Sequence, residues 1–442
     1  MNGRQYVVAK RMNSLKKLHL DRGALKAHQL KKLHALLKTT LADNPFYKAK
    51  LRAAGTDHLP ESLDDFITRT PLTTKRELVD DQRRNPPYGS NRAFPIEHYC
   101  RYHQTSGTTS TPVRWLDTRE SWNWMVDSWE HIFESAGITP QDRIFFPFSF
   151  GPFLGFWSAF DAANRMGCLA IPGGGQRSAA RLSTIVDNAV TAICATPTYA
   201  IHLGEAAHEE NIALSAMKVR AIIVAGEPGG AIPSTRGLIE KLWPGIRVFD
   251  HYGMTEVGPV SYECPSRRGV AHVMESAYLA EVIDPETLAP VKPDDIGELV
   301  LTPLGRLGSP VIRYRTGDLV RPANPERCEC GSYELSLEGG ILGRTDDMVI
   351  VRGVNLYPSA VEDVLRAVGG IAEFQVDIST NNDLTELRLR VEPSASVTDP
   401  SRYATHVEQA LHQAFGLRFS VECVIPGTLP RFEMKAKRWK HK

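Results

Sequence analysis

The chain has 442 residues, and its 52 lysines and arginines against 51 aspartates and glutamates leave a formal net charge of +1. This length predicts two or three domains, and the balanced charge argues against nonspecific binding to nucleic acid. The sequence lacks an apolar run of about 18 residues, a secretory signal, and an even set of cysteines for a disulfide framework. We therefore expect a cytoplasmic protein that does not span a membrane and does not bind nucleic acid.

Leucines at roughly helical spacing predict an amphipathic helix within the first fifty residues, packed on the body of the protein. Between residues 100 and 260, short apolar runs alternate with helical patterns, which is typical of βαβ units around a mainly parallel sheet. The runs that predict its buried strands are Arg143–Phe146, Cys168–Ile171, Ala192–Ala195 and Ala221–Val224.

The pattern changes after residue 275. Alternating residues at Tyr278–Ile283 and Gly297–Leu301 predict antiparallel strands with turns between them. The last hundred residues predict a small α+β unit. Its predicted strands are Met348–Val351 and Leu387–Val391, and its predicted helices lie near Ser359–Val368 and Tyr403–Ala414.

A loop of small and hydroxyl residues, TSGTTSTP, covers Thr105–Pro112. Small residues let a backbone approach a polyanion, and hydroxyl and N–H groups can hold phosphate oxygens. The loop has no lysine after its glycine, so it is not a P-loop, and alone it is more typical of an ordinary surface loop. Phosphate binding and a plain surface loop both remain open at this point.

Four further segments carry groups suited to chemistry. His251–Glu256 (HYGMTE) follows an apolar run, so its ring, hydroxyl and carboxylate are expected at the carboxyl end of a strand, where α/β sheets bind ligands. Tyr314–Leu319 (YRTGDL) sets a carboxylate after a glycine turn. The other two are Gly343–Met348 (GRTDDM), which leads into Arg352–Pro358 (RGVNLYP), and Pro430–Arg438 (PRFEMKAKR).

Together and in this order, the five segments resemble the motifs of the adenylate-forming superfamily of acyl-CoA synthetases, most of all the phenylacetate–CoA ligase branch. The resemblance runs from Pro71–Lys75 (PLTTK) to Lys435. It implies an AMP-forming ligase that joins a carboxylic acid to AMP, releases pyrophosphate, and passes the acyl group to coenzyme A. It also implies an α/β fold: a large multi-sheet N-terminal domain, residues 1–342, and a small mobile α+β C-terminal lid, residues 343–442.

The resemblance assigns a role to each motif. The phosphate loop would wrap the β- and γ-phosphates, Gly226 and Glu227 would line the adenine side, and Asp318 would accept both ribose hydroxyls. A plain structural alternative exists for each residue, because Asp318 can cap a turn and Tyr252 can be core. The residues implied to bind ATP are Ser106, Gly107, Thr108, Thr109, Gly226, Glu227, Tyr252, Gly253, Asp318 and Arg344.

The implied catalytic residues are Lys435, Glu256 and Thr255. Glu256 would hold Mg²⁺, a hard cation suited to carboxylate and phosphate oxygens. Lys435 would reach the reacting carboxylate and α-phosphate, where a fixed cation offsets developing charge. Met434 departs from the family pattern, which usually has glycine before this lysine. We interpret the basic residues after Lys435 as a solvated chain end, with contacts to coenzyme A phosphates as the alternative.

Asp346 is the implied hinge about which the lid turns between the half-reactions, since hinge positions absorb large dihedral changes in few residues. After the turn, Arg352 and Gly353 would face the pantetheine entrance for coenzyme A. The acyl pocket of this branch is built by the segment Phe148–Trp157. Within it, Phe150 and Phe153 beside Gly151 can present flat walls to an aryl acid.

His251 completes this predicted pocket, and we expect a compact aryl carboxylic acid in preference to a long fatty acid. One alternative is an adenylating enzyme that hands the aryl group to a carrier-protein thiol or to an amine. A nucleotide-binding module that has lost catalysis is another, and a zinc-stabilised nucleic-acid-binding protein is disfavoured by the net charge. A carrier-protein partner and a homodimeric state are left open.

A candidate metal site lies outside these motifs. Three thiolates and one imidazole make a tetrahedral structural zinc set. Here the C-x-C spacing is tight and the other loop has no recognised finger spacing, so unrelated cysteines and a surface histidine are the alternative. Relatives of the phenylacetate–CoA ligase branch carry Cys, His and C-x-C at matching positions, and this favours structural Zn²⁺. The candidate ligands are Cys264, His272, Cys328 and Cys330.

Overall fold

The computed structural model describes residues 21–105, 112–323, 327–347, 349–351, 354–381, 384–432 and 436–441. Several predicted site residues lie outside this part of the chain: Ser106, Gly107, Thr108, Thr109, Arg352, Gly353 and Lys435. Among the described helices, none has the length and apolar character needed to cross a membrane.

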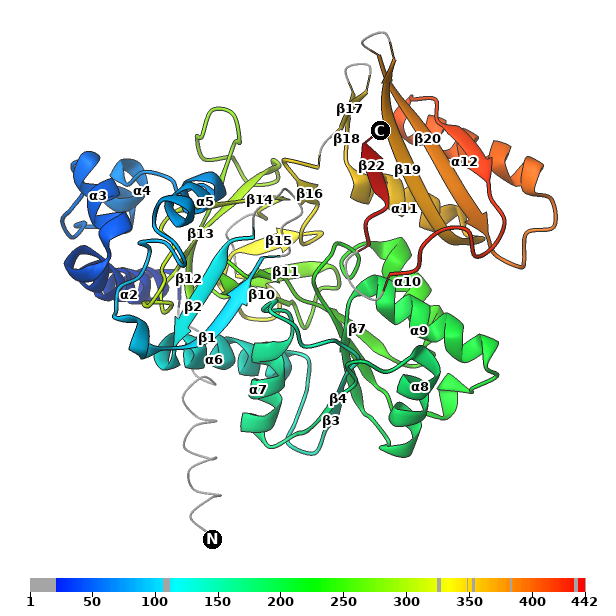
Figure 1. The fold of residues 1–442 in the computed structure, drawn as a ribbon, viewed down its shortest axis with the longest axis horizontal. Coiled ribbons are helices and arrows are strands. Elements are labelled where there is room, and N and C mark those ends of the chain that lie inside the picture. Colours follow the sequence, from blue (N-terminus) through cyan, green and yellow to red (C-terminus); the bar gives the residue numbers. More distant parts are fainter. Residues whose placement is uncertain are drawn as a thin grey trace.

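The N-terminal helices form a layer against the antiparallel strands (Figure 1). Their order is α2 (Arg22–Asp43), α3 (Pro45–Ala53), α4 (Leu63–Arg69) and α5 (Lys75–Arg84). Leu33, Leu36 and Leu37 of α2 are buried in one cluster with Leu279 and Ile312. The predicted amphipathic helix that packs on the body is thus confirmed for the described residues.

A five-stranded parallel sheet with strand order β4-β3-β5-β6-β7 forms the next part. Alternate residues of β5 and β6 enter two different clusters: Cys194 and Ile223 pack with α6 and α7, whereas Ile193 and Ile222 pack with α8, α9 and α10. Helices therefore cover both faces, as the βαβ pattern predicts. The strands are β3 (Arg143–Phe146), β4 (Leu169–Pro172), β5 (Ala192–Ala195), β6 (Ala221–Val224) and β7 (Arg247–Asp250); the helices are α6 (Arg119–Ser135), α7 (Trp157–Met166), α8 (Ser178–Asp187), α9 (Pro197–Glu209) and α10 (Pro233–Leu242).

One of the four predicted strands is not buried. β4 stands at the edge of the parallel sheet, and Leu169 is 55% exposed. An edge strand pairs on one side only, so an apolar run such as Cys168–Ile171 does not by itself establish burial. The prediction of a strand here is confirmed, and the prediction that it is buried is wrong.

Antiparallel sheets occupy the middle of the molecule. A four-stranded sheet has the order β12-β13-β14-β16, and a three-stranded sheet has the order β10-β11-β15. The predicted antiparallel pairing of Tyr278–Ile283 with the following strand is confirmed. The strands are β1 (Tyr99–Gln104), β2 (Arg114–Thr118), β8 (Gly253–Met254), β9 (Gly258–Pro259), β10 (Ser261–Glu263), β11 (Val270–Val273), β12 (Tyr278–Ile283), β13 (Gly297–Pro303), β14 (Tyr314–Val320), β15 (Ser336–Glu338) and β16 (Gly343–Arg344).

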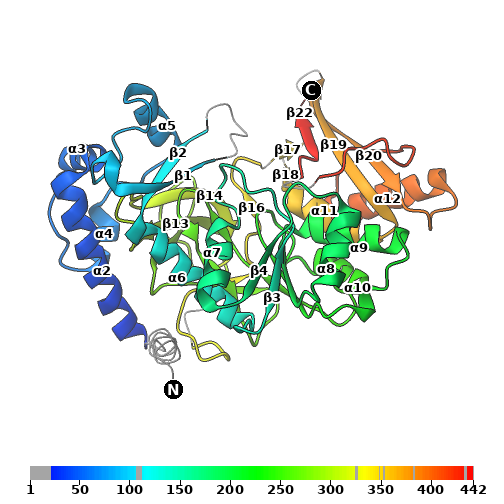
Figure 2. The same ribbon diagram turned by 60° about the horizontal axis from the view of Figure 1, so that its bottom comes forward.

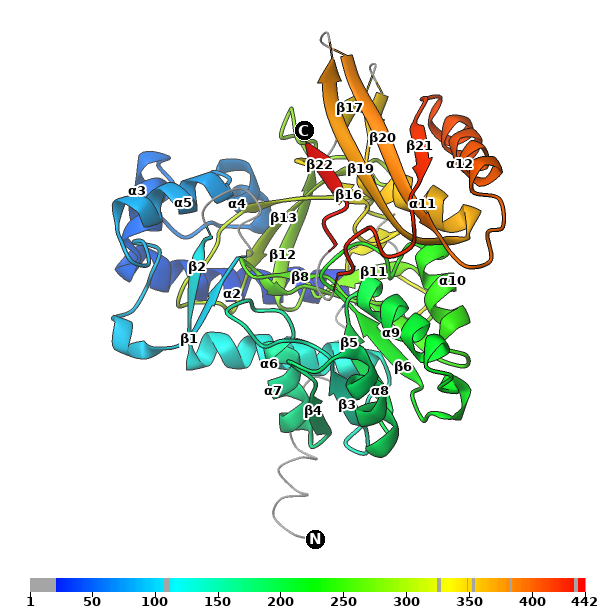
Figure 3. The same cartoon turned by 45° about the vertical axis from the view of Figure 1, so that its right-hand side comes forward.

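The C-terminal unit has a core of its own, whose fully buried members lie between Val351 and Phe419. Figures 2 and 3 show it seated over α9 and α10, with α11 next to α10. Its sheet has the order β21-β20-β19-β22. The elements are β17 (Val349–Val351), β18 (Val354–Leu356), α11 (Pro358–Val368), β19 (Ile371–Asn381), β20 (Leu384–Pro393), α12 (Pro400–Phe415), β21 (Ser420–Cys423) and β22 (Trp439–His441).

The residues described after Lys435, 436–441, are not simply a solvated tail, although Lys437 and Lys440 are exposed. Trp439–His441 forms β22, which pairs in parallel with β19, and Arg438 is only 6% exposed. The Arg438 guanidinium donates to the Glu373 carboxylate at 2.6 and 3.2 Å. The sequence shows only a run of basic residues here, because Glu373, the acidic partner of the buried Arg438, lies 65 residues earlier in the chain.

Candidate active site

Several of the predicted site residues that the structure describes lie at the carboxyl ends of the parallel strands. Gly226 and Glu227 follow β6, and His251–Glu256 follows β7. Because neighbouring parallel strands end at the same edge of a sheet, these loops meet, at the position where open α/β sheets bind ligands. The strands β14 and β16 bring Asp318 and Arg344 to the same place, since these two residues are register partners.

Asp318 is the point where these segments are joined. The Tyr252 phenol donates to its Oδ2 at 2.5 Å, and Arg344 Nη1 donates to its Oδ1 at 2.9 Å. Burial and the neighbouring Asp318 charge raise the pKa of Tyr252 well above its usual value, so the phenol stays a donor. A carboxylate has several lone-pair sites that accept hydrogen bonds, which suits Asp318 to hydroxyl donors.

Arg344 also connects this centre to the predicted hinge. Its Nε donates to Asp346 Oδ1 at 2.8 Å while Nη1 holds Asp318. Gly317 makes room for the guanidinium: its φ is +75°, and a Cβ there would lie 2.9 Å from Arg344 Nη2. The sequence Gly317–Asp318 therefore serves the approach of the arginine as well as the turn.

Glu256, the predicted magnesium ligand, is 3% exposed, and Lys75 Nζ lies 3.4 Å from its Oε1. Lys75 opens α5, whose start is fixed by a capping box between Thr74 and Glu77. Lys75 marks the beginning of the resemblance in the sequence, but it is not among the predicted site residues. The repeated hydroxyls and charge of PLTTK were the available signal.

A fully buried ion pair supports the Thr255–Glu256 loop from behind. Arg306 donates through Nε and Nη2 to the two oxygens of Asp117, each at 2.7 Å. Its Nη1 donates to the Thr255 carbonyl at 2.6 Å. Burial alone would raise the pKa of Asp117, but the Arg306 charge brings it below the usual value. Neither residue belongs to a motif, and 189 residues separate them, so sequence reasoning had no means of pairing them.

The ends of the predicted phosphate loop are fixed to each other. The Thr105 N–H donates to the Val113 carbonyl at 3.0 Å, and the Val113 N–H donates to Thr105 Oγ1 at 3.0 Å. The loop thus connects the antiparallel strands β1 and β2. The backbone N–H of Gln104 donates to the Pro152 carbonyl at 2.7 Å, which joins this region to the predicted acyl segment.

The predicted acyl segment lies in a cluster of aromatic rings. The half-buried Phe150 has its ring centroid 4.7 Å from that of Trp157 and 5.6 Å from that of Phe148. Trp157 Nε1 donates to the Gly151 carbonyl at 3.0 Å. Phe153 is also half-buried. An aromatic wall is therefore present along this segment.

His251 belongs to the far end of the same cluster. Its ring centroid is 4.4 Å from that of Trp129, and its Nδ1 contacts the Ser261 carbonyl at 2.7 Å. A carbonyl only accepts, so Nδ1 carries the proton. Burial lowers the pKa of His251 to about 4, which leaves the imidazole neutral at neutral pH. Aromatic contacts through Phe148, Phe156 and Trp129 link it to Phe150.

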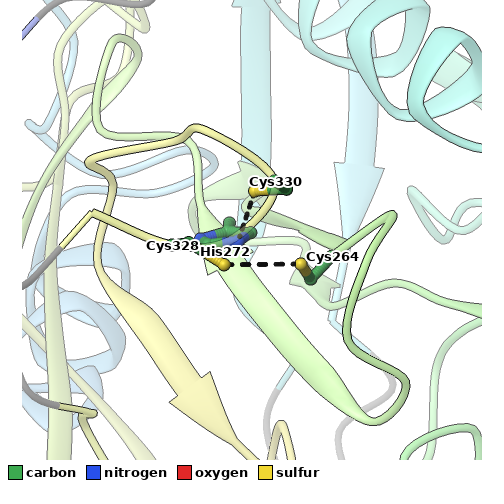
Figure 4. A group of neighbouring side chains, drawn as sticks. All are labelled: Cys264, His272, Cys328 and Cys330. Carbon is green, nitrogen blue, oxygen red and sulfur yellow. Dashed lines mark hydrogen bonds between the residues drawn. The ribbon is translucent and has the colours of Figure 1, made fainter.

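The four candidate metal ligands converge, as Figure 4 shows: their ligand atoms all lie within 4.8 Å of one another. Cys264 Sγ is 3.6 Å from Cys328 Sγ, and Cys330 Sγ is 3.4 Å from His272 Nε2. A tetrahedral ion bound to thiolates at about 2.3 Å separates their sulfurs by roughly 3.8 Å, so the donor set fits Zn²⁺. The second imidazole nitrogen of His272 contacts Ser336 Oγ at 3.2 Å, which holds the ring.

Comparison with known proteins agrees with this site. The AMP-binding enzyme family model matches residues 31–303, and the AMP-binding enzyme C-terminal domain model matches residues 353–442. Phenylacetate-coenzyme A ligases of Thermus thermophilus and Escherichia coli are each 31% identical to the chain, over 94% of its length and 95% and 94% of theirs. The chain belongs to the AMP-binding enzyme family.

Solved structures extend this result. The crystal structure of 2-hydroxyisobutyryl-CoA ligase in the postadenylation state matches with a TM-score of 0.86 at 28% identity, covering 96% of this chain and 90% of that one. The structure of the same ligase in the thioesterification state also covers 96% of this chain and 90% of its own, at 30% identity, but its TM-score is 0.68. The overall arrangement of our chain is thus more similar to the postadenylation structure than to the thioesterification structure. Within the family, the chain is an AMP-forming acid–thiol ligase, which adenylates a carboxylic acid with ATP and then forms a coenzyme A thioester.

The buried pair predicts a large loss of stability for Asp117→Asn. The amide leaves the buried Arg306 charge uncompensated, so we expect the free energy of unfolding to fall by about 3 to 5 kcal/mol. Arg52→Ala is the matched control, because the Arg52–Asp57 pair is exposed and is expected to contribute less than about 1 kcal/mol. Urea unfolding of both variants measures the difference, and similar losses would contradict the assignment.

Proposed function

We propose that the acid activated by this chain is a compact aryl carboxylic acid. The observation that carries the proposal is the aromatic segment: the Gln104–Pro152 hydrogen bond holds it next to the predicted phosphate loop. An acid lying against Phe150 and Phe153 would then have its carboxylate near the triphosphate. The relatives named phenylacetate-coenzyme A ligase support an aryl acid. The likeness to 2-hydroxyisobutyryl-CoA ligase supports a short hydroxy acid as the second candidate.

In the first half-reaction, a carboxylate oxygen attacks the α-phosphorus of ATP and pyrophosphate leaves. We assign the ribose hydroxyls to Asp318, with Arg344 beside the ribose and α-phosphate. The Tyr252 ring and the backbone around Gly253 are assigned to the adenine side. The residues assigned to the β- and γ-phosphates are Ser106, Gly107, Thr108 and Thr109.

Lys435 is the proposed catalytic cation of this step, because a fixed positive charge offsets the charge that develops at the reacting oxygens. Glu256, with Thr255 beside it, is proposed to hold Mg²⁺, and the bound ion would supply positive charge to the phosphate oxygens. The Glu256 carboxylate is buried, and the nearby Lys75 balances its charge.

In the second half-reaction, the coenzyme A thiolate attacks the acyl carbonyl and AMP leaves. We propose that the C-terminal unit first turns about Asp346, which brings Arg352 and Gly353 to the pantetheine entrance. The turn breaks the Arg344–Asp346 pair. Because the Asp346 side chain is 58% exposed, this pair contributes little to stability and opposes the turn weakly.

Pyrophosphate release across a panel of acids tests the proposal. The panel holds benzoic and phenylacetic acids, 2-hydroxyisobutyric acid and a long fatty acid, each with and without coenzyme A. We expect release and thioester formation to favour the aryl acids, and Lys435→Ala to lower release by about 100-fold or more. A preference for 2-hydroxyisobutyric acid would favour the second candidate. Adenylate that accumulates without thioester would indicate a carrier-protein or amine acceptor.

Phe150→Ala tests the aromatic wall directly. Loss of the ring removes apolar contact with the acid, so we expect kcat/KM for the preferred aryl acid to fall about 10- to 100-fold, with KM for ATP unchanged. Phe94→Ala is the control, since Phe94 is also half-buried but stacks on His98. Equal effects of the two substitutions would place Phe150 outside the acyl pocket.

We also propose that Cys264, His272, Cys328 and Cys330 hold one structural Zn²⁺. The four ligands fill a tetrahedral shell, so the ion would tie the end of β10 to the turn before β15 and take no part in catalysis. We expect about one zinc per chain by mass spectrometry, and both Cys328→Ser and chelation to lower Tm by roughly 5 °C or more. Cys100→Ser, at an exposed cysteine, is the control. Undiminished zinc in Cys328→Ser would contradict the site.

A further inference from the structure

Glu227 makes a contact that its motif does not explain. Its Oε1 accepts the backbone N–H of Thr198 at 2.8 Å, and its Oε2 accepts the backbone N–H of Ala436 at 3.0 Å. Thr198 lies in the first turn of α9, in the large unit, whereas Ala436 lies in the C-terminal segment, 209 residues after Glu227. One carboxylate therefore joins the two units.

The large unit holds this carboxylate firmly. The first N–H groups of a helix have no partner inside the helix and carry partial positive charge. In α9, the Thr196 side chain accepts the N–H of Tyr199 at 3.1 Å, and Glu227 accepts that of Thr198. With one oxygen fixed on the helix, the other is directed at the C-terminal segment.

The C-terminal unit fixes the segment that contains Ala436. Two residues beyond Ala436, the Arg438 carbonyl accepts the N–H of Val376, and its guanidinium binds Glu373 and Glu362. Arg438 Nη1 also lies 3.5 Å from Thr198 Oγ1. Ala436 is thus placed between an anchor within its own unit and the carboxylate of the other unit.

The Ala436 N–H belongs to the peptide bond with Lys435, so a hydrogen bond to this group acts directly on the backbone of the lysine. We propose that Glu227 is a positioning residue for the adenylation half-reaction: by accepting the Ala436 N–H, it fixes the backbone that follows Lys435, the residue proposed to act at the α-phosphate. The inference rests on the catalytic role proposed for Lys435. The contact joins the two units in the arrangement that resembles the postadenylation state, so it serves the first half-reaction and opens for the second.

Glu227→Gln is the decisive variant. The amide has the size of the carboxylate but only one acceptor oxygen, so it can accept one of the two N–H groups and not both. Ser234→Ala is the matched control: the Ser234 hydroxyl donates to Asp363 at 2.5 Å, also between the units, but on α10 and α11. Loss of docking alone would affect both variants.

We would measure one dissociation constant and two rates in the full-length protein: the Kd for ATP, the single-turnover rate of adenylate formation, and the rate of thioester formation from adenylate and coenzyme A. The substrates are the most active aryl acid of the panel and its chemically prepared adenylate. For Glu227→Gln we expect adenylate formation to slow about 10- to 100-fold, since small misplacements of a catalytic group have effects of this size. Both carboxylate oxygens of Glu227 are used by backbone N–H groups, so a contact with adenine would come from its backbone, which the substitution keeps. The Kd for ATP and the thioester rate should therefore stay within about twofold of wild type.

The double variant Glu227→Gln/Lys435→Ala separates positioning from other roles. If Glu227 acts through Lys435, the double variant should form adenylate no more slowly than Lys435→Ala alone, because the two effects are not additive. Additive losses, a raised Kd for ATP with an unchanged rate, or an equal loss in Ser234→Ala would each overturn the inference. Full adenylation by Lys435→Ala would instead overturn the role proposed for the lysine.

Discussion

The hydrogen bonds from Tyr252 and Arg344 to the two oxygens of Asp318 are the contacts on which the rest of the site depends. Tyr252 comes from the loop after the parallel sheet, Asp318 from the antiparallel strand β14, and Arg344 from β16, which pairs with β14. No single sheet contains all three residues, so their meeting fixes how the sheets are placed relative to one another. Tyr252, Asp318 and Arg344 are therefore held in place by one another, and if they bind the nucleotide as proposed, this would reduce the entropy that binding must overcome.

Buried charged residues outside the motifs hold the Thr255–Glu256 loop in place. The Thr255–Glu256 loop is short and carries a buried carboxylate, and Arg306 fixes its backbone while Asp117 balances Arg306. Lys75 approaches the carboxylate from the N-terminal helices. Residues of three distant parts of the chain thus support one loop, and the N-terminal helical layer contributes to the site as well as to the core.

The sequence was sufficient for features that depend on local pattern. Apolar runs such as Ala192–Ala195 and Ala221–Val224 became central parallel strands, and the motif loops met at their carboxyl ends because parallel topology requires it. Features that depend on long-range partners were missed. The exposure of Leu169 follows from its place at the sheet edge, the burial of Arg438 from Glu373, and the Asp117–Arg306 pair from chain segments with no shared motif.

The sharing of Arg344 between Asp318 and Asp346 has a thermodynamic consequence. A ligand that draws Arg344 toward Asp318 would weaken its hold on Asp346, so occupancy of the proposed ribose position would bias the torsions at the proposed hinge. Linkage is reciprocal: a turn that frees Arg344 from Asp346 must change the affinity for the ligand by the same factor. In an enzyme that turns about Asp346, nucleotide release and the orientation of the C-terminal unit would be thermodynamically coupled.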